Sequence, residues 1–205
     1  HPIEVMKREN EETLKVTAQA KELLQSLDEF QGHDLTEIIL KLRGFFNQLF
    51  DVDKHYQRKE YLLFPYLENK GITGPPKVMW GKHDEIRELI KGSIEILQQT
   101  DVTLDELKAS AEIIFDQTLF GIEDMTVKEE QILFPMALDK LTDAEWYEIS
   151  KQSLEIGFCL YDPPTEWRPK GIEETSINEA QKSGNHIQLP SGGFSAAELL
   201  AILNT

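Results

Sequence analysis

The chain has 205 residues, 40% of them hydrophobic, which is enough for one substantial core with an appendage. Its formal net charge of -16 argues against a nucleic-acid partner, because phosphates would be repelled, and fits the solvated surface of a cytoplasmic protein. No run approaches the roughly 18 apolar residues of a membrane span, so no membrane insertion is expected. The one cysteine, Cys159, excludes an intramolecular disulfide.

Two helices are predicted in the first third of the chain. The first covers residues 2–28 and is broken by the Gln-Gly-His sequence that follows. Asp34 opens the second helix, and Glu37 lies at the spacing of a capping box. This long helix extends to about Asn69, and Pro65 inside it predicts a kink or a local loss of regular hydrogen bonding.

Three more helices are predicted before residue 158. One starts near Pro76 and ends near Gln99, and the next is opened by the capping box of Thr103 and Glu106 and extends to about Leu138. A short fifth helix, capped by Thr142 and Glu145, follows. Four long helices in two similar hairpins predict an all-α, up-down-up-down bundle over residues 1–157.

The last part of the chain is different in character. Residues 158–193 show no sustained period and are predicted to be a linker. Ser195 and Glu198 predict one more short helix within residues 194–205. Because an isolated helix of this length is marginal in water, we expect it to dock on the bundle, to pack on a second copy of the chain as a homodimer, or to lead into a further domain.

The chain contains a diverged internal repeat. Residues 49–67 align without gaps on residues 119–137, and both segments contain a Leu-Phe-Pro sequence. In this alignment Glu60 matches Glu130, and His55 matches Met125. A second pair of segments, 5–12 and 78–85, also aligns. It places Asn10 against His83, so at each of the two matched positions one copy keeps a histidine that the other copy lacks.

The repeat nominates four candidate metal ligands: His55, Glu60, His83 and Glu130. Antiparallel hairpins bring these positions to one level inside the bundle. His55 and Glu60 are five residues apart, about 140° around a regular helix, so both can face the interior only where the helix is locally bent or loosened. Two imidazoles and two carboxylates make a mixed nitrogen and oxygen set that suits iron, manganese or zinc.

Two alternatives stay open at this point. The four side chains could be buried polar groups that bond one another without a metal ion. One of the neighbouring glutamates could instead turn inward and replace a missing histidine; the candidates are Glu9, Glu11, Glu12, Glu123 and Glu129. Asn10 and Met125 remove a histidine from each of two helices, which argues against a dinuclear, oxygen-carrying centre.

The segments around the candidate ligands resemble the hemerythrin-like family, also called HHE cation-binding domains. The resemblance covers residues 1–157 and is carried by KEYLLFPYL after His55, by KEEQILFP in the second copy and by VMWGKHDEIREL around His83. It implies a four-helix bundle that holds iron, often two irons, through histidines and carboxylates. By position, His55, Glu60, His83 and Glu130 match family ligands, whereas Asn10 and Met125 stand where the family has histidine.

A narrower resemblance covers the full length. HPIEVMKREN, LFPYLENKGITGPPKVMWGKHDEIR and LPSGGFSAAELLAILNT are similar to the hemerythrin-like and linker region of the DUF438 family. That resemblance implies a PAS sensory domain downstream of residue 205.

The sequence therefore favours a metal-binding module that senses oxygen, redox state or metal supply within a signalling protein. One rival hypothesis is a structural or interaction module whose metal site has decayed. Another is an enzyme with a mononuclear iron site.

Overall fold

The structure is a computed structural model that describes residues 1–30, 34–169, 186–189 and 192–195, the last two ranges by their backbone pairing alone. The chain divides into two compact units, His1–Arg168 and Pro169–Thr205. In the described part of the first unit, all regular structure is helical. The helices make four arms and a fifth, shorter element.

The first arm is α1 (Pro2–Gln25), followed by the 3-10 turn η1 (Ser26–Phe30). The second arm is continuous through four segments: α2 (Thr36–Phe50), α3 (Val52–Arg58), the π-helical η2 (Lys59–Leu63) and α4 (Phe64–Asn69). The third arm is α5 (Gly74–Leu97). None of the helices in the described part of the chain is long and apolar enough to cross a membrane.

The fourth arm repeats the build of the second. It consists of α6 (Leu104–Ser110), the π-helical η3 (Ala111–Phe115), α7 (Asp116–Lys128), the π-helical η4 (Glu129–Leu133) and α8 (Phe134–Lys140). The short α9 (Asp143–Ile156) follows.

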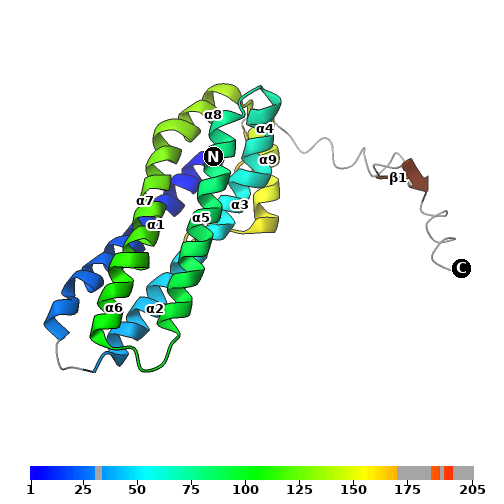
Figure 1. The fold of residues 1–205 in the computed structure, drawn as a ribbon. Helices are drawn as coiled ribbons and strands as arrows, with labels where there is room; N and C mark the ends of the chain where they lie inside the picture. Colours follow the sequence, from blue (N-terminus) through cyan, green and yellow to red (C-terminus); the bar gives the residue numbers. More distant parts are fainter. Residues whose placement is uncertain (31–33, 170–185, 190–191, 196–205) are drawn as a thin grey trace, which may run out of the picture. The chain divides into compact units, whose positions relative to one another are not determined.

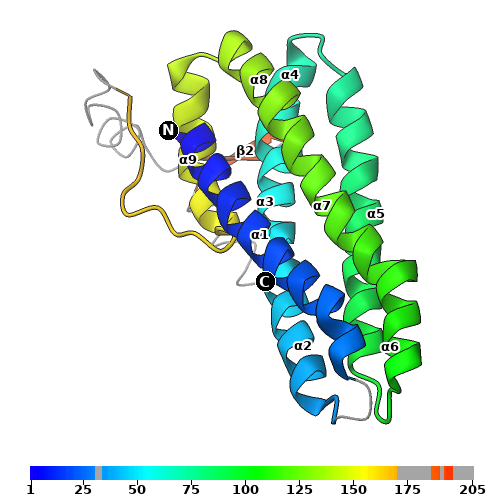
Figure 2. The same cartoon turned by 90° about the vertical axis from the view of Figure 1, so that its left-hand side faces the viewer.

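The four arms form a closed up-down-up-down bundle (Figures 1 and 2). Helix α1 packs on α2, α2 on α5, α5 on α7, and α7 again on α1. Helix α9 covers one end of the bundle, where it contacts α3, η2 and α1. The all-α bundle predicted from the repeated hairpins is confirmed.

Of the three predicted capping boxes that fall within the described residues, two are confirmed. Thr103 with Glu106 and Thr142 with Glu145 form complete capping boxes. The box predicted at Asp34 does not form, because the N-cap of α2 is Leu35. The Asp34 carboxylate instead accepts hydrogen bonds from the backbone N–H and the hydroxyl of Thr36, at 2.9 and 2.7 Å.

Each Leu-Phe-Pro sequence follows a π-helical turn. Pro65 and Pro135 lie just after η2 and η4, and neither can donate a backbone hydrogen bond. Before each proline the backbone changes to i→i+5 bonding, so that Phe64 N–H donates to the Lys59 carbonyl and Phe134 N–H to the Glu129 carbonyl. The loosening predicted around Pro65 is thus present, and it begins between His55 and Glu60.

The core runs the length of the bundle and is closely packed between the arms. Its largest apolar members include Phe46, Phe64, Phe115 and Trp146, all almost fully buried. The rings of Phe46 in α2 and Phe115 in η3 lie 5.1 Å apart, so they join the second arm to the fourth. Polar side chains interrupt this core at one level, nearer the end that α9 covers.

The second unit contains two short strands within the described residues. Strands β1 (His186–Leu189) and β2 (Gly192–Ser195) pair antiparallel, with Ile187 opposite Phe194. This hairpin falls in the range that the sequence analysis assigned mainly to a linker. The helix predicted within residues 194–205 falls beyond Ser195 on residues outside those that the structure describes.

Replacing Phe46 by Ala should lower the free energy of unfolding by about 3–5 kcal/mol, because the change leaves a cavity between two arms. The matched control is Phe120→Ala, since Phe120 is 66% exposed; its effect should stay within about 0.5 kcal/mol. Urea unfolding followed by circular dichroism measures both. Equal losses in the two variants would contradict the described packing.

Candidate metal centre

A cluster of buried polar side chains lies between all four arms. The second arm contributes His55, Arg58, Lys59 and Glu60, all at most 2% exposed. Helix α1 brings Glu9 and Asn10, α5 brings His83 and Arg87, and η4 brings Glu129. The charged side chains and histidines inside the bundle therefore lie at the level that the sequence predicted for the candidate ligands.

His83 is oriented by Glu60. The Nδ1 atom of His83 lies 2.7 Å from Glu60 Oε1. Arg87 donates to the same carboxylate through both terminal nitrogens, from Nη1 to Oε1 at 3.0 Å and from Nη2 to Oε2 at 2.7 Å. A carboxylate held by arginine accepts, so the Nδ1–H donates and the lone pair of the ring sits on Nε2. That Nε2 atom is buried and has no hydrogen-bond partner among the described residues.

The imidazole of His83 is further held between two aromatic rings. Tyr56 stacks on it with centroids 4.1 Å apart, and Phe64 lies parallel on the same ring at 6.0 Å. Burial, and after it the positive charge of Lys59, holds the pKa of His83 far below its ordinary value. His83 is therefore a neutral imidazole with a fixed orientation.

His55 is oriented in a similar way by Glu9. Its Nδ1 lies 2.8 Å from Glu9 Oε2, and Arg58 binds the Glu9 carboxylate in turn. Glu9 Oε1 also accepts from the backbone N–H of Cys159 at 2.7 Å. Both histidines thus have a carboxylate on Nδ1 and an arginine behind that carboxylate.

Glu129 occupies the middle of the cluster. Its Oε2 lies 2.8 Å from His55 Nε2 and 3.1 Å from Asn10 Nδ2, and its Oε1 accepts from the Lys59 ammonium. Burial alone would raise the pKa of Glu129, but the charge of Lys59 and the hydrogen bonds with Lys59 and His55 hold the pKa well below its ordinary value. Glu129 is therefore an ionised carboxylate surrounded by donors.

The structure brings three of the four predicted ligands into the interior and places the fourth outside. His55, Glu60 and His83 are buried, but Glu130 is exposed, with its Oε1 3.4 Å from Asn10 Nδ2. The neighbouring Glu129 is the buried carboxylate of η4. Glu9 and Glu129 were among the glutamates that the sequence left as alternatives, and both turn inward.

The π-helical turn does not by itself separate Glu129 from Glu130. In the repeat alignment Glu130 matches Glu60, which predicts equal orientation for the two. Both residues lie in π segments that begin at equivalent positions, Lys59 and Glu129. In the first copy positions 59 and 60 both face the interior, whereas in the second copy only Glu129 does. Sequence spacing alone does not reveal this difference.

The two positions without histidine behave differently from each other. Asn10 remains polar and donates its amide hydrogen to Glu129. Met125 is 1% exposed and belongs to the apolar core. Neither residue adds a nitrogen ligand, so two of the four arms lack a histidine at this level.

The chemistry of the inward donors fits one metal ion. His83 Nε2 is an unpaired nitrogen, and His55 Nε2 and Glu129 complete a set of two imidazoles and one carboxylate, which suits non-haem iron. A carboxylate on the outer nitrogen of each histidine is the usual support of a metal-bound imidazole. In the part of the chain that is described, however, no three His, Cys, Asp or Glu side chains are already gathered around one point as a metal would need.

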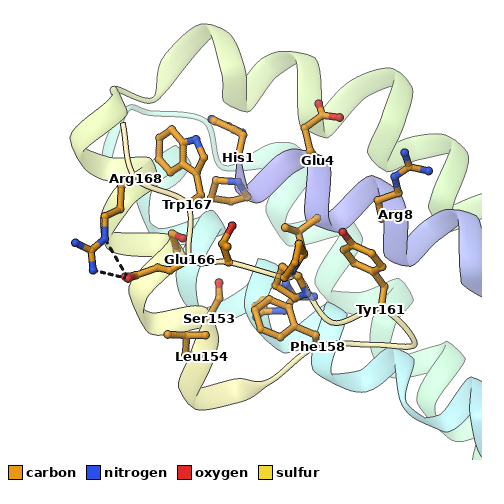
Figure 3. Close-up of a pocket in the computed structure, with 17 residues that line it drawn as sticks. His1, Glu4, Arg8, Ser153, Leu154, Phe158, Tyr161, Glu166, Trp167 and Arg168 are labelled. Carbon is orange, nitrogen blue, oxygen red and sulfur yellow. Dashed lines mark hydrogen bonds and ion pairs between the residues drawn. The ribbon is translucent and has the colours of Figure 1, made fainter. Parts of the chain in front are cut away.

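A large cavity lies beside the cluster rather than in it. It has a volume of about 660 Å³ and lies between the start of α1, helix α9 and the segment after α9 (Figure 3). Phe158, Tyr161 and Trp167 line it, as does Arg58, whose guanidinium lies 4.8 Å from the centre of the Phe158 ring. Neither histidine of the cluster lines this cavity.

Comparison with known families assigns the bundle to one of them. The family model described as Hemerythrin HHE cation binding domain matches residues 1–137, about two thirds of the chain. A search of curated proteins finds no match. The matched range includes every residue of the cluster, and the chain belongs to this family of cation-binding domains.

The buried neutral His83 should make the metal-free protein lose stability as the pH falls below about 6.5. The unfolded chain takes up a proton there, but the folded chain, whose His83 pKa is lowered, does not. Between pH 6.5 and 5 the free energy of unfolding should fall by about 2 kcal/mol from this group. The pKa values of Glu9 and Glu129 are lowered in the folded chain, so the stability that these two carboxylates contribute is lost only below about pH 4.5.

Urea unfolding at several pH values, with a chelator present, measures this dependence. The matched control is His83→Gln, which has no titrating ring and should show a flatter profile over the same range. Identical profiles for the two proteins would contradict a neutral, buried His83.

Proposed function

We propose that this member of the hemerythrin family binds a single divalent metal ion, with iron favoured over zinc or manganese, and acts as a sensor of oxygen, redox state or metal supply. The observation that carries the proposal is the buried Nε2 of His83, which has no partner while Glu60 and Arg87 fix its ring. An unpaired buried nitrogen is costly unless a ligand fills its place.

The residues take distinct roles in this proposal. His55 and His83 are the nitrogen ligands and Glu129 is the carboxylate ligand. Glu60, predicted from the sequence as a ligand, acts on His83 instead, because both its oxygens are bound by His83 and Arg87. Glu9 has the same role toward His55. The bound metal would supply a redox-active centre, and the protein supplies its orientation and excludes water from it.

The sensor role is supported by the distribution of the proposed ligands over the arms of the bundle. His55, His83 and Glu129 belong to the second, third and fourth arms, and Glu9 to the first. A change in the charge of the bound ion acts on all four arms at once, since each arm holds a charged group of the cluster. We expect such a change to be passed through the chain after α9 to a downstream module; the resemblance to DUF438 suggests a PAS domain, and a homodimer would be a second route.

One observation favours a structural module as the second candidate function. The buried carboxylates Glu9, Glu60 and Glu129 already face three cations, Arg58, Arg87 and Lys59. A cluster with balanced charges is stable without a metal ion. In that case the cluster would serve only to fix the arms in register.

Metal analysis with ligand variants decides between the two candidates. The untagged protein is loaded anaerobically with Fe²⁺, desalted and analysed for iron. We expect about one iron per chain, and His83→Ala should lower the occupancy strongly, because a methyl group cannot replace a nitrogen ligand.

The carboxylate assignment has a matched pair of variants. Glu129→Gln should also lower the occupancy, whereas Glu130→Gln, one residue away on the exposed side, should keep at least about four fifths of it. Circular dichroism checks that each variant is folded. Unchanged iron content in folded His83→Ala protein would leave the structural module as the function.

A further inference from the structure

Lys59 is a buried cation for which the proposed function gives no role. Its side chain is fully buried, its ammonium donates to Glu129 Oε1, and its Nζ lies 4.4 Å from the centre of the Tyr56 ring. Burial lowers the pKa of Lys59, whereas the negative charge of Glu129 raises it. A charged amine inside a bundle is unfavourable unless an opposite charge holds it, so its place depends on Glu129.

Lys59 and Glu129 are equivalent positions of the internal repeat. Residues 49–67 align on residues 119–137, and the π-helical turn of each copy begins at this position. The two side chains therefore meet across the bundle from matched places on the second and fourth arms. Were both acidic, as Glu129 is, two carboxylates would face each other and would need a cation between them. Lys59 brings that positive charge as part of the chain.

We propose that the Lys59 ammonium is a built-in cation of this centre: on Glu129 it holds the position that a second metal ion would take, and so limits the centre to one divalent ion. The part of this inference that concerns the divalent ion rests on the proposed function. The position of the Lys59 ammonium on Glu129 does not depend on it. Lys59 is then a residue that sets how many cations bind and how tightly.

The consequence for affinity follows from charge. A divalent ion bound by His83, His55 and Glu129 shares the Glu129 carboxylate with Lys59. The two positive charges repel each other in a region with little water, where screening is weak. Removing the charge of Lys59 should therefore make Glu129 a stronger ligand and open a position next to it.

The test compares Zn²⁺ binding by the wild-type chain with that of Lys59→Met, by competition with a chromophoric chelator, followed by a metal count after dialysis. Lys59→Met should bind Zn²⁺ at least about tenfold more tightly, and its metal count should rise above that of the wild type. The matched control is Lys82→Met, which removes the same charge next to His83 but at a side chain that is 45% exposed. Its affinity should stay within about twofold.

Two further variants keep the test decisive if Lys59→Met does not fold. Lys59→Gln removes the charge but keeps a donor for Glu129, and it should also bind Zn²⁺ more tightly. Lys59→Arg keeps the charge, and it should bind Zn²⁺ no more tightly than the wild type. Equal Zn²⁺ affinity of Lys59→Gln, Lys59→Arg and the wild type would overturn the inference.

The failures of the two proposals are distinguishable. If the wild type binds Zn²⁺ through His83 and the neutral Lys59 variants bind it no better, the inference fails and the proposed function stands. If the wild type shows no binding that depends on His83 but Lys59→Gln gains it, the inference holds and the wild-type domain is a structural module. If no protein in the series binds Zn²⁺, both proposals fail.

Discussion

The structure depends on the pairing of charges inside the bundle, and the second arm is the centre of that pairing. Its residues Arg58, Lys59 and Glu60 reach, in that order, Glu9 on the first arm, Glu129 on the fourth and Arg87 on the third. A buried charge that loses its partner lowers the free energy of unfolding by several kcal/mol. Each pair therefore fixes the register of two arms along the bundle axis. Apolar contacts such as Phe46 on Phe115 supply most of the stabilisation, whereas the charged level fixes the register.

Three consecutive buried residues on one helix need an unusual backbone. Successive residues of an α-helix point about 100° apart, so three in a row spread over about 200° and cannot all face the interior of a regular helix. The π-helical turn that begins at Lys59 removes this limit. This π-helical turn precedes Pro65, which has no N–H and so interrupts the series of α-helical backbone hydrogen bonds. A proline in the sequence therefore allows the second arm to hold Arg58, Lys59 and Glu60 inside.

The bundle and the level of the cluster could be predicted from the sequence, because both follow from repetition. The hairpins repeat, the capping boxes at Thr103 and Thr142 mark helix starts, and His55 and His83 lie at matched depths. The identity of the buried carboxylate could not be predicted in this way. Glu129 and Glu130 are adjacent, both acidic, and lie in the same π-helical turn, so neither residue type nor spacing tells which of the two faces the interior. Arg58 and Lys59 were missed because charged side chains next to a candidate ligand are usually solvated, and here three-dimensional pairing overrides that rule.

The asymmetry between the two copies supports the proposal of one metal ion rather than two. At the fourth arm, Met125 fills core space, and Asn10 and Lys59 of the first copy already bind both oxygens of Glu129. At the third arm, the aromatic rings and the Glu60–Arg87 pair hold His83 in place while its Nε2 stays unpaired. The divergence of the two copies has thus left a carboxylate that the chain itself neutralises and a histidine nitrogen that is still free to bind a ligand.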